Sequence, residues 1–266
     1  MSGKGAMVVT AATRVVAVLQ ARTTSSRLPG KVLQDVAGKP MLLRQIERIR
    51  RSRLIDDLVV ATSDHSSDAN LAAIVAASGT AVFRGSLDDV LDRFASAART
   101  RPSAHVVRLT GDCPLADPDV IDAVIAHHLV SGADITTNAV SPTLPDGLDV
   151  EVVRSRCLDE ANREAIAAVE REHVTQFFYR RTDRFCVVHY VCPRDRSGAR
   201  WTVDEPEDLA FVRAVYAALV NDKPAFGLHD VFALLDANPE LALINKSFER
   251  NEGLAASIAA ERAEQS

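Results

Sequence analysis

Aromatic side chains and excess positive charge are both scarce in this 266-residue sequence. Phe, Trp and Tyr make up 5% of the residues, and 31 Lys and Arg are outnumbered by 36 Asp and Glu, so the formal net charge is −5. Few aromatics disfavour a platform on which nucleic-acid bases stack, and an acidic balance disfavours a broad surface for phosphate backbones. We therefore expect no nucleic-acid partner, although a local cluster of cations is compatible with these totals.

Paired cysteines and long apolar runs are also absent from the sequence. There is no CxxC pair, which disfavours a zinc ribbon or a thioredoxin-like site, and no stretch approaches the roughly 20 apolar residues of a membrane span. We expect a soluble, cytoplasmic protein with no membrane partner, whose reduced thiols are mostly buried. The four cysteines are Cys113, Cys157, Cys186 and Cys192.

Short β-branched runs alternate with helical segments along the chain. This alternation predicts an α/β fold, a single domain in three layers with a mixed, mostly parallel sheet. We expect strands over Arg14–Gln20, Asp57–Ala61, Ala81–Phe83, His105–Leu109, Asp149–Val153, Cys186–Val191 and Trp201–Val203. We expect helices from about Pro40 and over Ser66–Ser78, Leu87–Arg99, Pro118–Val130, Ser155–Ile166, Val169–Arg180, Glu205–Val220, His229–Leu235 and Ser247–Arg262.

The same pattern divides the chain into three parts. Residues 1–13 are expected to be a flexible N-terminal tail, because they precede the first strand. Residues 14–220 carry the alternation of strands and helices, and residues 221–266 form a helical C-terminal extension. Asp117 is the expected N-cap of the helix that begins at Pro118.

The strongest local signal follows the first expected strand, in a loop that reads QARTTSSRLPGK. Arg22, Arg27 and Lys31 lie there within ten positions, interleaved with hydroxyls. Ligands of an α/β sheet bind outside the carboxyl ends of its strands, so cations at this place suit a triphosphate. A Walker A motif would need Gly at Ser25 and Ser or Thr at Val32, and no GxGxxG follows a strand. A solvated basic loop is the alternative.

Seven stretches resemble the motifs of one enzyme family. They are QARTTSSRLPGK from Gln20, GKPM from Gly38, RLTGDCPL from Arg108, PDGLDVE from Pro145, EREHVT from Glu170, WTVDEPED from Trp201 and RNEG from Arg250. Together they resemble the sugar cytidylyltransferases, which include the CMP-KDO synthetases and the acylneuraminate cytidylyltransferases. The closest resemblance is to the branch named after spore coat polysaccharide biosynthesis protein F, and it extends from about residue 14 to about residue 260.

The resemblance implies a fold, a reaction and a set of partners. The fold is that of the nucleotide-diphospho-sugar transferases, of GT-A type, with a nucleotidyltransferase-like domain at 14–220 in which residues 149–200 bind sugar and form a dimer interface. The reaction is Mg²⁺-dependent transfer of CMP from CTP to a sugar acid or related sugar, with release of pyrophosphate, in surface polysaccharide or glycoconjugate biosynthesis. The implied partners are CTP, a small sugar and a second copy of the chain in a homodimer.

The resemblance also assigns roles to individual residues. Arg27, Lys31 and Asp112 are the expected catalytic residues, and Asp112 and Asp204 are the expected Mg²⁺ ligands. The expected nucleotide-binding residues are Ala21, Arg22, Ser25, Ser26, Arg27, Lys31, Arg84, Gly85, Ser86, Arg93 and Gly111. The expected sugar-binding residues are Arg108, Asp146, Gly147, Asp149, Glu151 and His173.

Each assignment has a structural alternative. Asp112 could form an Asx-turn, and Asp204 could cap the helix that follows it. Arg108 could pair with a neighbouring aspartate, and His173 could be an ordinary structural histidine. The remaining assignments compete with ordinary turns and solvent-exposed faces over 84–93 and 146–151.

Two other functions compete with the transferase. A glycosyltransferase of similar architecture would consume a nucleotide-sugar through a DxD metal motif, for which the candidate is Asp117-Pro-Asp119, a stretch that suits a helix start better. A catalytically silent nucleotide-binding protein is disfavoured because none of the motifs is eroded. Cys113 has no His or Asn partner in the pattern, so packing is favoured over a nucleophilic role. Release of pyrophosphate from CTP separates the two enzymes.

Overall fold

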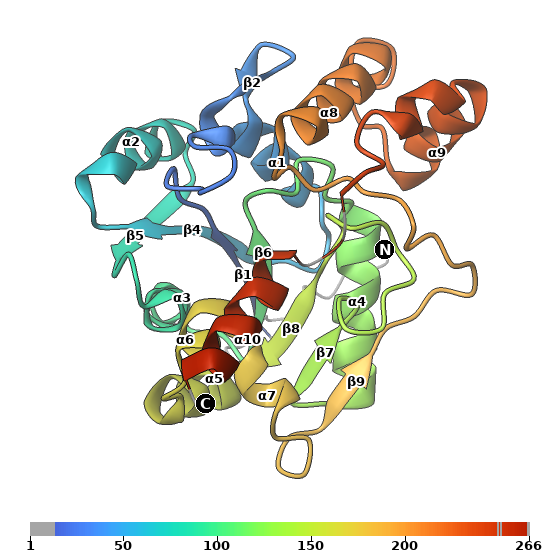
Figure 1. The fold of residues 1–266 in the computed structure, drawn as a ribbon. Helices are drawn as coiled ribbons and strands as arrows, with labels where there is room; N and C mark the ends of the chain where they lie inside the picture. Colours follow the sequence, from blue (N-terminus) through green and yellow to red (C-terminus); the bar gives the residue numbers. More distant parts are fainter. Residues whose placement is uncertain (1–13, 249, 251, 265–266) are drawn as a thin grey trace, which may run out of the picture.

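The computed structural model describes residues 14–248, 250 and 252–264, so the expected tail at 1–13 lies outside the described residues. The main sheet (Figure 1) has seven strands, in the order β5 (Ala81–Gly85), β4 (Asp57–Ser63), β1 (Val15–Gln20), β6 (His105–Thr110), β8 (Glu151–Arg154), β7 (Ile135–Thr137) and β9 (Val187–His189). β8 pairs antiparallel with both neighbours, and the other pairings are parallel. The predicted mixed, mostly parallel sheet is confirmed.

Helices pack on both faces of this sheet, which makes three layers. Along β1, Val15, Ala17 and Leu19 enter one core, whereas Val16 and Val18 enter the other. Burial on both faces explains the continuous apolar run of this strand. The first core is covered by α1 (Met41–Ile49), α2 (Ala69–Ala77), α4 (Pro118–Ser131), α8 (Pro206–Leu219) and α9 (Leu228–Ala237). The second is covered by α3 (Val90–Arg99), α5 (Ser155–Glu164) and α7 (Gln176–Tyr179).

One expected helix is broken and several short elements were not expected. The segment Val169–Arg180 forms two helices, α6 (Ala168–His173) and α7, because Val174 adopts a positive φ of 50° between them. A helix cannot continue through that left-handed residue. The short elements that the pattern missed are β7, the hairpin of β2 (Asp35–Val36) and β3 (Lys39–Pro40), and the 3-10 turns η1 (Lys31–Leu33), η2 (Ser66–Asp68) and η3 (Pro239–Leu243).

The strand expected at Trp201–Val203 is wrong. The segment is extended and buried, but it joins two loops instead of entering a ladder. Its first N–H donates to the carbonyl oxygen of Asp146 at 2.7 Å, and its last N–H donates to that of Asp112 at 2.8 Å. The segment therefore ties together the loops that carry acidic residues of the site.

The carboxyl ends of β1 and β6 open on one edge of the sheet. Gln20 and Thr110 are partners in register there, so the loops that follow the two strands begin side by side. Gly111 permits this approach, because a Cβ at that position would lie 2.8 Å from the Ala21 Cβ. The last helix, α10 (Glu252–Glu264), packs beside α6 (Figure 1). Among the described residues, none of the helices is long and apolar enough to cross a membrane.

Candidate active site

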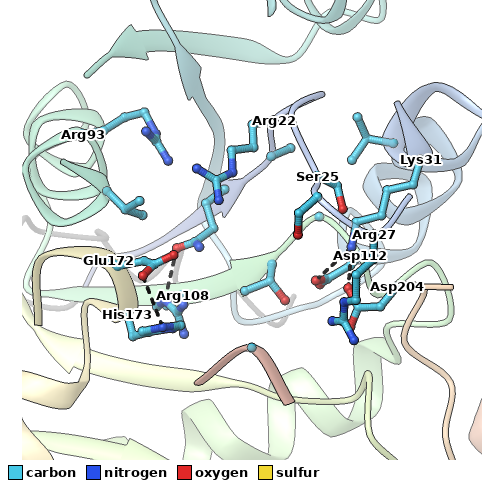
Figure 2. A pocket seen from close by; sticks show the side chains of 18 residues that line it. Arg22, Ser25, Arg27, Lys31, Arg93, Arg108, Asp112, Glu172, His173 and Asp204 are labelled. Carbon is cyan, nitrogen blue, oxygen red and sulfur yellow. Dashed lines mark hydrogen bonds and ion pairs between the residues drawn. The ribbon is translucent and has the colours of Figure 1, made fainter. Parts of the chain in front are cut away.

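A cleft of about 320 Å³, the nucleotide cleft, opens at the carboxyl ends of β1 and β6 (Figure 2). Its walls are the loop after β1, the start of α3, the turn after β6 and the end of α6. It brings together a large part of the expected site, namely Ala21, Arg22, Ser25, Ser26, Arg27, Lys31, Arg93, Arg108, Gly111, Asp112, His173 and Asp204. The loop expected to hold phosphates therefore faces the two aspartates expected to hold a metal.

Lys31 lies between these two aspartates (Figure 2). Its Nζ is 2.7 Å from Asp204 Oδ1 and 3.5 Å from Asp112 Oδ2, and it donates to the carbonyl oxygen of Val203 at 2.7 Å. Burial opposes the ammonium charge, but the two carboxylates outweigh it and raise the pKa of Lys31 above its ordinary value. Lys31 is thus a permanent cation at the end of the cleft that holds the two aspartates.

Arg27 brings a second cation to the same end of the cleft. Its guanidinium lies 2.8 Å from Asp204 Oδ2, 3.3 Å from Glu205 Oε1 and 2.7 Å from Glu252 Oε2. The side chain remains about one-third exposed, so it can exchange these carboxylates for phosphate oxygens that enter the cleft. Glu252 belongs to α10, so the C-terminal extension reaches the site.

Asp112 and Asp204 suit a hard divalent cation. Both carboxylates already share one positive charge, and Mg²⁺ is usually held by one or two carboxylates together with substrate phosphates. Among the described residues, no group of three or more His, Cys, Asp or Glu is arranged to hold a metal. The two aspartates therefore fit a metal whose remaining ligands come from a phosphate and water.

The helix-cap alternative for Asp204 is wrong. Glu205 is the N-cap of α8, and the N–H groups of Asp204 and Glu205 both donate to Asp208. The Asp204 carboxylate instead contacts Lys31 and Arg27 in the cleft, and Arg200 at 3.5 Å. Cys113 lies buried, and burial beside Asp112 raises the pKa of its thiol well above the ordinary value, which fits packing and not nucleophilic attack.

Arg93 and Arg22 occupy the opposite end of the nucleotide cleft. Arg93 is almost fully buried; its Nη1 donates to the carbonyl oxygen of Leu87 at 3.0 Å, and its Nε has no hydrogen-bond partner among the described residues. Burial, together with the charge of Arg22, lowers the pKa of Arg93. An oxygen-rich ligand would satisfy this end of the cleft.

The structure does not bring the segment Arg84–Ser86 to the nucleotide cleft. The Arg84 guanidinium turns to the loop after β4, where it donates to the carbonyl oxygens of Ser63, Asp64 and His65 at 2.9–3.0 Å. Ser86 caps the turn before α3 by accepting from the Asp89 N–H. The nucleotide-binding role of these residues stays a prediction.

A second cleft of about 350 Å³, the acceptor cleft, adjoins the first and shares Arg108, Thr110 and His173 with it. Asp149 and Glu151 line it, as the sequence led us to expect for sugar-binding residues. Other lining residues were missed, namely Thr110, Ala139, Val140, Thr175, Gln176, Tyr179 and Leu254. The EREHVT motif predicted that this region belongs to the site. The helix break at Val174, after which Gln176 and Tyr179 of α7 line the cleft, could not be predicted from the local sequence.

Arg108 and Glu151 form a buried ion pair between the clefts, on the neighbouring strands β6 and β8. Arg108 also donates to Gln20 Oε1 at 3.1 Å, and the Tyr179 hydroxyl donates to Glu151. The sequence left open that Arg108 pairs with a neighbouring aspartate. The structure shows such a pairing, but the acidic partner is a glutamate, Glu151. His173 contacts Ser257 Oγ of α10 at 3.0 Å, and burial lowers the pKa of its imidazole, which is neutral at pH 7.

Asp146 and Gly147 line neither cleft and instead support the loop beneath them. Asp146 accepts from Arg200 at 3.2 Å, and Gly147 has a φ of 99° at a place where a Cβ would lie 2.5 Å from the Thr202 backbone nitrogen. Asp149, two residues on, faces the acceptor cleft and pairs with Arg250.

The DxD candidate lies outside both clefts. Asp117 caps α4, as predicted, by accepting from the N–H groups of Asp119 and Val120, and it also accepts from Leu228 N–H at 2.6 Å. Asp119 is largely exposed and lies 3.4 Å from Arg53. These contacts leave the glycosyltransferase interpretation without its metal motif.

A family model described as cytidylyltransferase matches residues 16–220 of the chain. The chain belongs to this family. The cytidylyltransferase is 34% identical over 232 residues to the spore coat polysaccharide biosynthesis protein SpsF of Bacillus subtilis (strain 168), which covers 85% of this chain and 95% of that protein. It is 31% identical over 244 residues to a 3-deoxy-manno-octulosonate cytidylyltransferase of Anaeromyxobacter sp. (strain Fw109-5), and the match covers 77% of this chain and 98% of that protein.

Solved structures agree with the family. A cytidylyltransferase from Leptospira borgpetersenii serovar Hardjo-bovis (strain JB197) superposes with a TM-score of 0.83 at 29% identity, over 90% of this chain and 100% of that chain. The nucleotide-diphospho-sugar transferase fold and a nucleotidyltransferase activity, both predicted from the motifs, are confirmed by these matches.

Proposed function

We propose that this cytidylyltransferase transfers CMP from CTP to a hydroxyl of a sugar acid or related sugar and releases pyrophosphate, with Mg²⁺ as cofactor, in surface polysaccharide or glycoconjugate biosynthesis. One observation carries the proposal: the cations Arg27 and Lys31 face the carboxylates Asp112 and Asp204 in a cleft that adjoins a second, acidic cleft. Two adjoining clefts suit a nucleotide and an acceptor held for in-line attack.

The residues of the nucleotide cleft supply charge and alignment. Arg27 and Lys31 bind the phosphates that leave as pyrophosphate, whose charge grows in the transition state, so both act on rate as well as on binding. Asp112 and Asp204 would hold Mg²⁺, which would neutralise charge on the phosphate oxygens. Lys31, which lies between the same two aspartates, supplies a further positive charge for phosphate oxygens that enter the cleft. Arg22, Ser25, Ser26, Ala21, Gly111 and Arg93 complete the nucleotide site.

The acceptor binds beside Arg108, Asp149, Glu151 and His173. These side chains offer acceptors and donors to sugar hydroxyls, and the apolar residues across the cleft suit the C–H face of a sugar. The relatives support a sugar acceptor, since one is named for spore coat polysaccharide biosynthesis and another for 3-deoxy-manno-octulosonate.

We also propose that the enzyme works as a cytoplasmic homodimer through the region 149–200. This region contains β9, which is an edge strand, and the exposed Val191 that follows it. An edge strand has unpaired backbone N–H and C=O groups, and with exposed apolar side chains beside it, it is suited to pair with a second copy of the chain. Light scattering at micromolar concentration tests the dimer, and a monomeric mass that does not change with concentration contradicts it.

The function is tested by pyrophosphate release. The full chain is incubated with CTP and Mg²⁺ and with a panel of sugar acids, neutral sugars and sugar phosphates, one at a time. The proposal predicts pyrophosphate only in the presence of CTP, Mg²⁺ and an accepted sugar, and its loss in Asp112→Asn. Hydrolysis or transfer of a nucleotide-sugar without pyrophosphate release from CTP would instead support a glycosyltransferase.

A further inference from the structure

We propose that Asp149 is the general base that takes the proton from the acceptor hydroxyl during CMP transfer. This inference rests on the proposed function, because a base is needed where the nucleophile arrives as a hydroxyl, whereas a sugar phosphate already presents an anionic oxygen. Three features of the molecule support Asp149: its place in the acceptor cleft, the rigidity of its loop and the charges around it.

Asp149 stands on the wall of the acceptor cleft, near its junction with the nucleotide cleft. The two clefts share Arg108, Thr110 and His173, and Asp149 lines the acceptor cleft together with all three. About a quarter of its side chain is exposed, so a molecule bound in the cleft can contact it. An acceptor hydroxyl that reaches across this junction toward the phosphates passes beside Asp149.

The loop that carries Asp149 is held on both sides. The amide of buried Asn138 clamps it: Nδ2 donates to the Leu148 carbonyl oxygen at 2.8 Å, and Oδ1 accepts from the Val150 N–H at 2.7 Å. Leu148 and Val150 are buried in the core, so the residue between them faces the other way, into the cleft. A group that must meet a proton within hydrogen-bond distance needs such a fixed backbone.

The charges around Asp149 keep its carboxylate poised between its two protonation states. Burial and the neighbouring carboxylates raise the pKa of Asp149 to about 7, against the opposing charge of Arg250. A general base with a pKa near the working pH is largely deprotonated when the acceptor binds, yet is still basic enough to take a proton from it. The groups that act on its charge are Arg250 of the C-terminal extension, Asp146 in its own loop, Glu151 on β8, and Asp112 and the neutral thiol of Cys113 after β6. Across the same cleft lie the titratable side chains of Arg108 on β6, His173 on α6 and Tyr179 on α7.

The step balances in protons and electrons. The acceptor oxygen gives its proton to an Asp149 carboxylate oxygen while it forms a bond to the α-phosphorus of CTP. The bond between that phosphorus and the bridging oxygen breaks, and pyrophosphate leaves with the electron pair. Asp149 then returns its proton to solvent through the open side of the cleft, and the carboxylate is restored.

Asp149→Asn and Asp149→Ala in the full chain test the proposal, with exposed Asp159→Asn as the matched control. We expect kcat to fall about 10²–10⁴-fold in both Asp149 variants, as is typical when a general base is removed. CTP binding, measured as a thermal shift, should stay at the wild-type value, because Asp149 does not line the nucleotide cleft. The acidic limb of the wild-type kcat profile near pH 7 should disappear in Asp149→Asn, and formate should partly restore turnover in Asp149→Ala.

The opposite pattern overturns the inference. His173 also lies at the junction of the clefts and is neutral, so it is the rival base. If Asp149→Asn keeps kcat and the acidic limb while His173→Asn loses them, the base is His173. If Asp149→Ala loses kcat but formate restores nothing and the acidic limb persists in Asp149→Asn, Asp149 only positions the acceptor. A wild-type chain that releases no pyrophosphate from CTP contradicts the proposed function instead, whatever the variants do.

Discussion

At the scale of single residues, the cations beside the acidic residues of the two clefts are already matched with carboxylates, whereas Arg93 donates to backbone carbonyl oxygens. Lys31 holds Asp112 and Asp204, Arg108 holds Glu151, and Arg250 holds Asp149. A buried charge that lacks a partner is costly, so this pairing lets a strongly charged site exist in the protein interior. Substrates must therefore exchange partners with these residues when they bind.

Removal of the Lys31 charge tests whether its pairing with Asp112 and Asp204 matters to the site. In Lys31→Met we expect kcat/KM for CTP to fall about 100-fold or more, because one preorganised charge at a transferring phosphate is worth that much. We also expect lower thermal stability, since two carboxylates then share a site without their cation. Lys39→Met is the matched control, because Lys39 is exposed and pairs with Glu47, away from the cleft. A CTP titration in Lys31→Met that overlays the wild type would exclude Lys31 from the phosphate site.

At the scale of secondary-structure elements, the clefts are made by loop ends and completed by the C-terminal helix. The loop after β1, the turn after β6 and the break between α6 and α7 supply most of the walls. α10 adds Gly253 to one cleft and Leu254 to the other, and its Ser257 contacts His173. Glu252, at the start of α10, pairs with Arg27 at 2.7 Å and so stands in the way of a phosphate on that cation.

Relief of this contact should strengthen nucleotide binding. An exposed ion pair is worth about 0.2–1 kcal/mol, so we expect Glu252→Gln to lower the Kd for CTP by up to about fivefold. Glu261→Gln is the matched control, because Glu261 lies on the same helix as Glu252 but pairs with Arg180 at the end of α7 instead of with Arg27. Isothermal titration of CTP into both variants measures the difference. Weaker binding in Glu252→Gln than in Glu261→Gln would mean that Glu252 assists the nucleotide.

Much of this arrangement was predictable from the sequence, because long apolar runs and caps carry strong local signals. The valines of β1 and the Asp117 cap of α4 are such cases, and the loop from Arg22 to Lys31 lies at the cleft as expected. Val174 was not predictable, since a positive φ at a β-branched residue is imposed by tertiary packing and contradicts local preference. The strand predicted at Trp201–Val203 was wrong for a related reason. Its alternating apolar and polar side chains indicate an extended backbone, but whether a neighbouring strand pairs with it depends on the whole fold.

At the scale of the whole molecule, the two ends of β6 lie in different surroundings. Its carboxyl end, at Thr110, lines the clefts, whereas its first residue, His105, lies beside a buried histidine of α4. His128 of α4 is fully buried there, with Nε2 3.0 Å from His105 Nδ1 and Nδ1 3.0 Å from Thr136 Oγ1. Burial, together with the neighbouring His105, lowers the pKa of His128 to about 4. The imidazole of His128 is therefore neutral at pH 7 in the folded chain, whereas in the unfolded chain it has its ordinary pKa.

Global stability should therefore depend on pH through His128. Between pH 6.5 and 4 the unfolded chain binds the proton and the folded chain does not, so the free energy of unfolding falls as pH decreases, by up to about 3 kcal/mol from this residue. Above pH 6.5 the contribution is constant. In His128→Gln we expect a less stable protein at pH 7, and a smaller loss between pH 7 and 5 in urea unfolding. Equal losses in the two proteins would contradict this assignment.

Transfer of CMP to a sugar can be followed directly through the phosphates of CTP. The full chain is supplied with Mg²⁺, the sugar that supports pyrophosphate release, and CTP labelled at the α-phosphate or, in a parallel reaction, at the γ-phosphate. We predict that α-label enters a CMP-sugar and γ-label enters pyrophosphate, in equal amounts, and that Asp112→Asn forms neither. Transfer of the γ-label to the sugar, or α-label recovered as free CMP and in no sugar product, would contradict CMP transfer.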